Sequence, residues 1–235
     1  MYDFYSDTKT KPSKEMLEYA LGRTFGDEQK DEDPTTLELC ERVASLLGKE
    51  SAVFLPSGTM CNEIAISVQT SPGDEILCDR TCHIINFEGG APAAMSGVMI
   101  HPLDGKYGQF TEEDVSQALR PKSRHMPISR MLCAEQTVNL GGGGVWPVEK
   151  LDSVAQVAKK SGLSTHLDGA RLLNACAKTG ISAARYSHEY DSCWIDFTKG
   201  LGAPVGAVLA GSTDFIEAAW RVKQRIGGAM RQSGV

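Results

Sequence analysis

Two residues whose chemistry could combine, Lys199 and Asp168, follow separate apolar segments. Lys199 closes "CWIDFTK", in which residues 193–197 are typical of a buried strand apart from Asp196. Asp168 lies in "THLDGARLLNA", where a glycine lets the chain turn and Arg171 follows closely. Taken alone, Asp168 and Arg171 could equally form a structural ion pair.

A lysine just beyond a buried strand can act as a nucleophile. Partial burial disfavours the charged ammonium, and the neutral amine can then condense with an aldehyde. Pyridoxal 5′-phosphate requires such a lysine, together with an acid that keeps its ring nitrogen protonated so that the ring accepts electrons. We therefore predict this cofactor, with Lys199 as its covalent anchor and Asp168 as the partner of the ring nitrogen.

Two further motifs could complete the cofactor site. Ser57, Gly58 and Thr59 in "FLPSGTM" lie between a strand and a helix, where free backbone N–H groups and the helix dipole attract a phosphate. By itself this tripeptide is more often a simple turn or cap. His83 in "DRTCHIINFEGG" follows a strand and precedes two glycines. A lone histidine is usually a surface or core residue, but beside the other motifs we predict that His83 stacks on the cofactor.

Strands alternate with helices along the chain, which predicts an α/β fold with a mostly parallel sheet flanked by helices. Catalytic groups are expected at the carboxyl ends of its strands. We expect Thr35 or Thr36 to cap a helix that Gly48 ends, and Thr111 to cap another with Asp114 three residues on. One strand is expected to begin at residue 51, and the others are expected at 74–80, 97–103, 130–135, 163–170, 193–199 and 203–211. Helices are expected within 33–50, 58–68, 111–119, 148–162 and 213–235, and one more in the segment before residue 97.

The composition limits the class of protein. The chain has 235 residues and a formal net charge of -6, which supplies no cation excess for nucleic acid or anionic lipid. We see neither a signal peptide nor an apolar run long enough to span a membrane. The seven cysteines form no CxxC pair, so we expect buried free thiols, no metal site and a reducing, cytoplasmic location.

Seven motifs together resemble those of the low-specificity L-threonine aldolases, which have the aspartate aminotransferase fold (fold type I). They are "SDTKTKPS", "EDPTTLELCERVASLLGKE", "LPSGTMCNEIAI", "HIINFEGG", "HLDGARLLNA", "FTKGLGAPVGAVLAGS" and "GGAMRQ", in the family's order over essentially the whole chain. The resemblance implies a seven-stranded sheet and a cofactor-binding large domain over residues 1–235 with an N-terminal arm. It also implies a missing small C-terminal domain, and a homodimer or homotetramer with sites between subunits.

The resemblance assigns roles to single residues. Lys199 would bind pyridoxal phosphate covalently, Asp168 would pair with its ring nitrogen, and His83 would stack on the ring. The phosphate would lie on Gly58 and Thr59. Ser6 and Arg171 would bind the substrate carboxylate. The implied reaction cleaves a β-hydroxy-α-amino acid to an aldehyde and glycine, with His83, or a water it orients, taking the hydroxyl proton.

Three features depart from the family pattern. Gln136 and Val138 in "EQTVN" replace an asparagine and a histidine, which suggests a roomier, more apolar pocket and makes phenylserine-type substrates credible beside threonine and allo-threonine. Lys30 and Asp31 stand where relatives have Tyr-Gly. The chain also ends before the segment that brings relatives a further arginine.

Other readings stay open. A β-eliminating lyase or a transaminase would use the same lysine and acid, and a truncated chain could bind the cofactor without turnover. A dinucleotide-binding loop at 200–206 is disfavoured, because Pro204 and the residues after it are typical of a strand. Arg221, Lys223 and Arg225 are typical of a solvated helix face, although the resemblance would allow Lys223 or Arg231 to approach a neighbouring subunit's phosphate.

Overall fold

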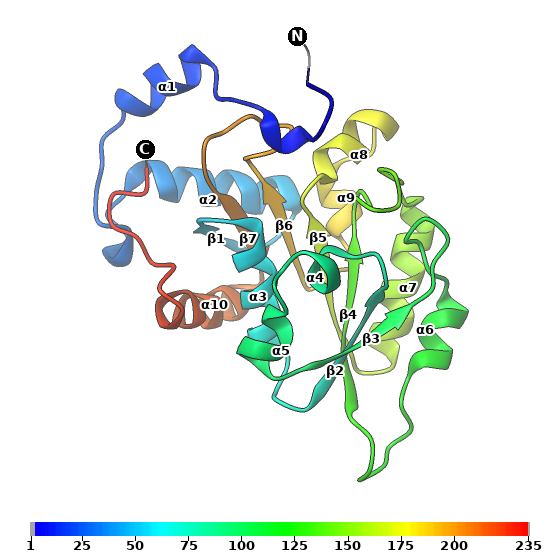
Figure 1. The fold of residues 1–235 in the computed structure, drawn as a ribbon. Helices are drawn as coiled ribbons and strands as arrows, with labels where there is room; N and C mark the ends of the chain where they lie inside the picture. Colours follow the sequence, from blue (N-terminus) through cyan, green and yellow to red (C-terminus); the bar gives the residue numbers. More distant parts are fainter. Residues whose placement is uncertain (1–2, 235) are drawn as a thin grey trace.

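A seven-stranded sheet forms the centre of the protein, whose residues 3–234 are described by a computed structural model (Figure 1). The strand order is β1-β7-β6-β5-β4-β2-β3, and only β7 runs antiparallel to its neighbours. The predicted mostly parallel, seven-stranded α/β fold is confirmed. The strands are β1 (Ser51–Leu55), β2 (Asp74–Asp79), β3 (Met99–Leu103), β4 (Ile128–Glu135), β5 (Ser164–Gly169), β6 (Ser192–Asp196) and β7 (Ala207–Gly211).

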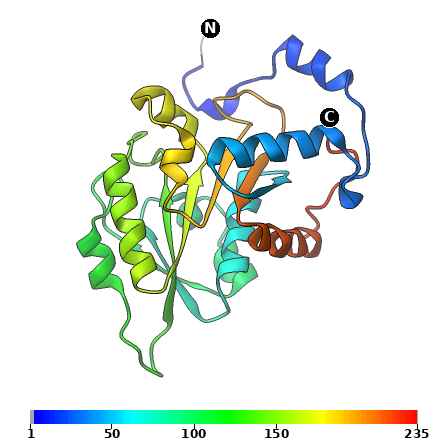
Figure 2. The ribbon, with the colours of Figure 1, turned by 180° about the vertical axis from the view of Figure 1, so that it is seen from behind.

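Helices cover both faces of the sheet (Figures 1 and 2). In one layer, α2 packs against α9, α9 packs against α7 and α8, and α6 packs against α7. In the other layer, α3 packs against α5 and α10. The helices are α1 (Lys14–Leu21), α2 (Pro34–Leu47), α3 (Gly58–Gln69), α4 (His83–Asn86), α5 (Ala91–Ser96), α6 (Glu112–Ala118), α7 (Val148–Lys160), α8 (Leu172–Thr179), α9 (Ala183–Ser187) and α10 (Thr213–Arg225). Between two helical layers the central strands are buried on both faces, and every residue of β6 and β7 is buried.

Capping explains where two of the helices begin. Thr111 and Asp114 form the predicted capping box of α6. The cap predicted for α2 is wrong: Asp33 accepts the hydrogen bond from the Thr36 amide, and Pro34 occupies the first helical turn. The helix still ends at Gly48, which has φ +62°.

The C-terminal segment is helical only in part. Helix α10 ends at Arg225, and the chain then returns to the start of α2, where the Gly234 amide donates to Asp33 Oδ2 at 3.2 Å. Within residues 3–234, no helix combines the length and apolar character needed to cross a membrane, and no group of three His, Cys, Asp or Glu side chains is arranged to hold a metal. All the cysteines are free; Cys61, Cys78, Cys82, Cys133 and Cys193 are buried, and Cys40 and Cys176 partly so.

Lys223 corrects the expectation of a solvated basic face on α10. Its side chain is fully buried and its ammonium donates to Glu28 Oε1, while Glu28 Oε2 accepts from the Met230 amide at 2.8 Å. Burial lowers the pKa of Lys223, and the contact with Glu28 opposes that shift. The pair holds the segment after α10 against the 3-10 turn η2 (Glu28–Lys30).

We expect Lys223→Met to lower the free energy of unfolding by about 3–5 kcal/mol, because it leaves Glu28 as an unpaired buried charge. The double variant Lys223→Met with Glu28→Gln removes both charges and should recover most of that loss. Urea unfolding of the three proteins measures the difference. Equal midpoints for the single variant and the parent protein would show that the pair does not hold this segment.

Candidate active site

A cavity of about 190 Å³ opens at the carboxyl ends of β5 and β6, where the fold predicts catalytic groups. These strands are parallel neighbours, and Asp168 lies opposite Trp194. The cavity brings together all but one of the predicted site residues: Ser57, Gly58, Thr59, His83, Asp168, Arg171 and Lys199. Ser6 does not line it.

Asp168 is almost fully buried at the end of β5, and hydrogen bonds hold both of its oxygens. Oδ1 accepts from the Ala170 amide at 3.1 Å, and Oδ2 accepts from Asn62 Nδ2 at 3.0 Å. The close approach of β5 to β6 requires glycine at 169, because a Cβ there would lie 2.1 Å from the Trp194 carbonyl oxygen. The carboxylate is therefore fixed in place at the cavity wall.

Asn62 on α3 connects Asp168 to the rest of the site, and the motif analysis did not single it out. Its Oδ1 accepts from Trp194 Nε1 at 2.7 Å, which fixes the orientation of the amide because indole only donates. The same oxygen lies 3.1 Å from His166 Nε2, so His166 carries its proton there, and Nδ1 accepts from the Ser192 hydroxyl at 2.8 Å. Burial lowers the pKa of His166 to about 3, so this ring is neutral.

His83 begins α4 and presents its ring to the cavity. Its Nδ1 lies 2.7 Å from Glu88 Oε1, and Asn62 Nδ2 donates to the same oxygen at 2.6 Å. The hydrogen bond to Glu88 raises the pKa of His83, and burial partly offsets the rise. Among residues 3–234 nothing is hydrogen-bonded to Nε2, so the neutral ring has its acceptor nitrogen free.

Lys199 lies in the loop that follows β6, with its side chain largely buried. Its ammonium donates to Asp196 Oδ2 at 2.8 Å and lies 5.5 Å from the centre of the Trp194 ring. Asp196 Oδ1 accepts from the amide and hydroxyl of Thr198. The signal for Asp196 was present in the sequence as the one charged residue of an apolar strand, but no role was assigned to it.

The predicted phosphate cradle is the start of α3. The Ser57 side chain caps the helix by accepting from the Met60 amide at 3.3 Å. A Cβ at Gly58 would lie 2.2 Å from Trp194 Cη2, so only glycine lets the backbone approach the indole at this point. Ser57, Gly58 and Thr59, at the start of this twelve-residue helix, line the cavity, and the first N–H groups of a helix have no partner within it.

Arg171 already has a partner within the chain. Its Nε and Nη2 donate to the two carboxylate oxygens of Asp7 at 2.6 and 2.8 Å, and this pairing lowers the pKa of Asp7. Ser6 caps the short turn η1 (Asp7–Lys9) by accepting from the Thr8 amide. Only the remaining N–H groups of Arg171 are left for a further anion.

Glu135 is a third acid at the cavity that the motifs did not identify. It ends β4 directly opposite Asp168, and its oxygens accept from the amides of His83 and Asn139. Burial, and then the charge of Asp168, raise the pKa of Glu135 to about 7. The carboxyl group can therefore gain or lose a proton near neutral pH.

Val138, one of the departures from the family pattern, lies outside the cavity. It is buried in the apolar core instead. Its side chain packs against Gly108 and Gly141, where a Cβ would clash with it. Gln136 is also buried, and its side-chain amide bonds to the backbone of Trp146. Neither residue supports a roomier substrate pocket.

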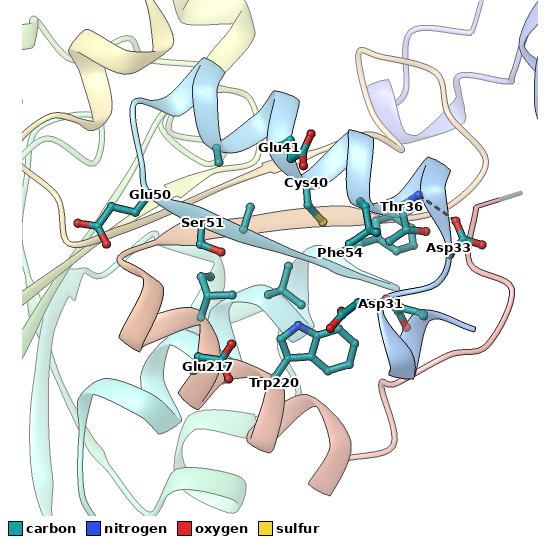
Figure 3. Close-up of a pocket in the computed structure, with 16 residues that line it drawn as sticks. Asp31, Asp33, Thr36, Cys40, Glu41, Glu50, Ser51, Phe54, Glu217 and Trp220 are labelled. Carbon is teal, nitrogen blue, oxygen red and sulfur yellow. Dashed lines mark hydrogen bonds between the residues drawn. The ribbon is translucent and has the colours of Figure 1, made fainter. Parts of the chain in front are cut away.

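A second cavity lies between α2, β1 and α10, with Phe54 and Trp220 in its walls and several carboxylates around its rim (Figure 3). Asp31, one of the two residues found in place of Tyr-Gly, lines this cavity rather than the one at β5 and β6. None of the predicted site residues lies here.

The residues at the first cavity fit pyridoxal phosphate. They supply an amine, a fixed carboxylate across from it, a histidine ring on the wall and a helix start that only glycine permits. The amine, in the loop after β6, and the carboxylate, at the end of the neighbouring strand β5, line the same cavity. None of the residue types at the predicted cofactor positions in this cavity opposes the cofactor chemistry.

Comparison with known proteins agrees with the geometry. A family model described as beta-eliminating lyase matches residues 3–235. The chain is 39% identical to the probable low-specificity L-threonine aldolase 2 of Arabidopsis thaliana, in an alignment that covers 99% of this chain and 67% of the relative. It is 36% identical to the low specificity L-threonine aldolase of Escherichia coli, with 100% of this chain and 70% of the relative covered. A crystal structure of a putative L-allo-threonine aldolase from Listeria monocytogenes is 27% identical with a TM-score of 0.81, covering 92% of this chain and 60% of that one.

The chain therefore belongs to the beta-eliminating lyase family. Within that family it is similar to the low-specificity L-threonine aldolases, as the motifs predicted, and pyridoxal phosphate is the family's cofactor. The chain spans between 57% and 70% of the length of the curated relatives that it matches.

We expect Gly58→Ala to weaken pyridoxal phosphate binding about tenfold or more, because overpacking against Trp194 costs roughly 1–3 kcal/mol. Absorbance titration of the protein with the cofactor measures the affinity. Gly22→Ala is the control, since a Cβ there meets nothing closer than 3.5 Å. Equal affinities for the two variants would contradict the role of the indole contact.

Proposed function

We propose that this chain cleaves β-hydroxy-α-amino acids of the threonine, allo-threonine or phenylserine type to glycine and an aldehyde, with pyridoxal phosphate. The observation that carries the proposal is the cavity that Lys199 and Asp168 share with a histidine whose Nε2 is free. Bound pyridoxal phosphate supplies an electron sink for the breaking of a carbon–carbon bond. Lys199 would hold it covalently, and Asp168 would accept a hydrogen bond from its ring nitrogen.

His83 is the proposed base. Because Glu88 accepts the Nδ1 proton, the neutral ring presents the Nε2 lone pair to the cavity, where it can take the proton from the substrate's β-hydroxyl group. The Glu88 carboxylate then stabilises the imidazolium that forms. Asp196 orients the Lys199 amine, which the substrate amine must replace.

Binding of the substrate carboxylate is assigned to Arg171 with Ser6. Asp7 occupies the Nε and Nη2 edge of the guanidinium, so the carboxylate would use the other N–H groups or compete with Asp7. We further propose that residues 1–235 form the cofactor-binding large domain. Its site would lie between subunits of a homodimer or homotetramer in the cytoplasm, and the free cysteines support that compartment.

We expect Lys199→Ala to lower substrate cleavage by roughly a thousandfold or more, because the covalent anchor is lost. Borohydride treatment of the parent protein with pyridoxal phosphate should attach the cofactor to Lys199, as mapped by mass spectrometry. Lys178→Ala, at an exposed lysine of α8, is the matched control. Borohydride labelling or full turnover that survives Lys199→Ala would overturn the assignment.

A product assay separates this function from that of another pyridoxal phosphate enzyme, such as a β-eliminating lyase or a transaminase. We expect threonine, allo-threonine and phenylserine to yield glycine and aldehyde in equal amounts, since the base acts on the β-hydroxyl proton. Elimination would instead release ammonia with an α-keto acid, and transamination would require an amino acceptor. Keto acid without glycine would refute the aldol assignment, and cofactor binding without any product would indicate a binding module.

A further inference from the structure

Glu63 is a buried acid that the proposed reaction does not use. It follows Asn62 on α3 and is 3% exposed, and among residues 3–234 neither of its carboxylate oxygens has a hydrogen-bond partner. Glu88 Oε2 is also buried without a hydrogen-bond partner among these residues, although Glu88 Oε1 binds both His83 and Asn62. Two buried carboxyl groups therefore each present an oxygen without a donor.

A proton on one of these two carboxyl groups would supply the missing hydrogen-bond donor. Two carboxylates that share a buried site cannot both be ionised at modest cost, and a protonated one becomes a donor to the other. Glu88 already has two hydrogen-bond partners, Asn62 and the His83 ring. Within residues 3–234 no cation pairs with Glu63, so the proton is assigned to Glu63.

We propose that Glu63 is a neutral carboxylic acid that donates to Glu88 Oε2 and thereby sets the basicity of His83 as a positioning residue. Glu88 connects the two residues, because its Oε1 lies 2.7 Å from His83 Nδ1 while its charge and hydrogen bonding act on Glu63. The donor withdraws negative charge from Glu88, so Glu88 holds the proton of the imidazolium less tightly. His83 then returns to its neutral, basic form at lower pH.

The electrostatic environment agrees with this arrangement. Burial, and then the charge and hydrogen bonding of Glu88, raise the pKa of Glu63 to about 8. Besides Glu88, Asp168 raises the pKa of His83 and Lys199 lowers it, and Glu135 accepts a hydrogen bond from the His83 amide and interacts with the charge of the ring. Glu63 is consequently protonated through the neutral range and ionises above it, which adds a second negative charge behind His83.

The catalytic consequence rests on the proposed function, but the proton itself can be measured without substrate. We expect the His83 ring signals in an NMR titration, assigned with His83→Asn, to move in two steps in a Glu135→Gln parent protein, in which the ionisation of Glu135 beside His83 is removed. The first is the protonation of His83, and the second is a smaller step near pH 8 from the ionisation of Glu63. In Glu63→Gln the amide still donates to Glu88, so the first midpoint should stay and the second step should disappear.

Glu63→Leu removes the donor without adding a charge. We expect it to raise the His83 midpoint by roughly one pH unit, since a hydrogen bond to a charged group contributes that order of free energy. Substrate cleavage at pH values below the new midpoint should then fall about tenfold and recover at higher pH, whereas a merely structural defect would lower activity equally at all pH values.

The outcomes decide between the two proposals. A single step in the parent protein, or a step near pH 8 that persists in Glu63→Gln, overturns the role of Glu63, and this holds even where Glu63→Leu fails to fold. An unmoved midpoint in a folded Glu63→Leu protein also overturns it. The expected titrations together with no aldehyde release from any substrate would support the shared proton and reject the proposed function.

Discussion

The side-chain amide of Asn62 is the group on which the arrangement of the site depends. Its two N–H donors bind Glu88 and Asp168, and its oxygen accepts from Trp194 and His166. Every hydrogen-bonding group of the amide is therefore used, in a region without solvent, where an unpaired polar group is costly. A single residue on α3 thus fixes groups from β5, β6 and the turn after α4 relative to one another.

This network divides the acids around the cavity into different chemical states. Asp168 accepts from two donors, whereas no donor in residues 3–234 reaches Glu63, the residue to which the proton is assigned. Glu88 lies between these extremes, because its Oε1 is shared by Asn62 and His83. Differences in hydrogen bonding, rather than in residue type, let similar carboxyl groups take different roles within one site.

Much of the fold and part of the site could be predicted from the sequence. The alternation of strands and helices is a local pattern, and it predicts the strands that carry Asp168 and precede Lys199, although β6 ends at Asp196, three residues before the lysine. Asn62 and Lys223 could not be recognised in this way, since their roles depend on partners far away in the chain. Helical periodicity places a residue on a face but does not identify what that face meets, so Lys223 was expected in solvent.

Trp194 contacts both parts of the proposed cofactor site, the phosphate cradle at the start of α3 and the anchor Lys199. The indole N–H binds Asn62 on α3, its ring edge lies against Gly58 at the start of the same helix, and its face lies below the Lys199 amine. The predicted phosphate cradle and the predicted anchor, which come from distant parts of the chain, therefore pack on one rigid side chain. A displacement of the indole would move both, so one buried aromatic residue fixes the predicted phosphate cradle relative to the predicted anchor.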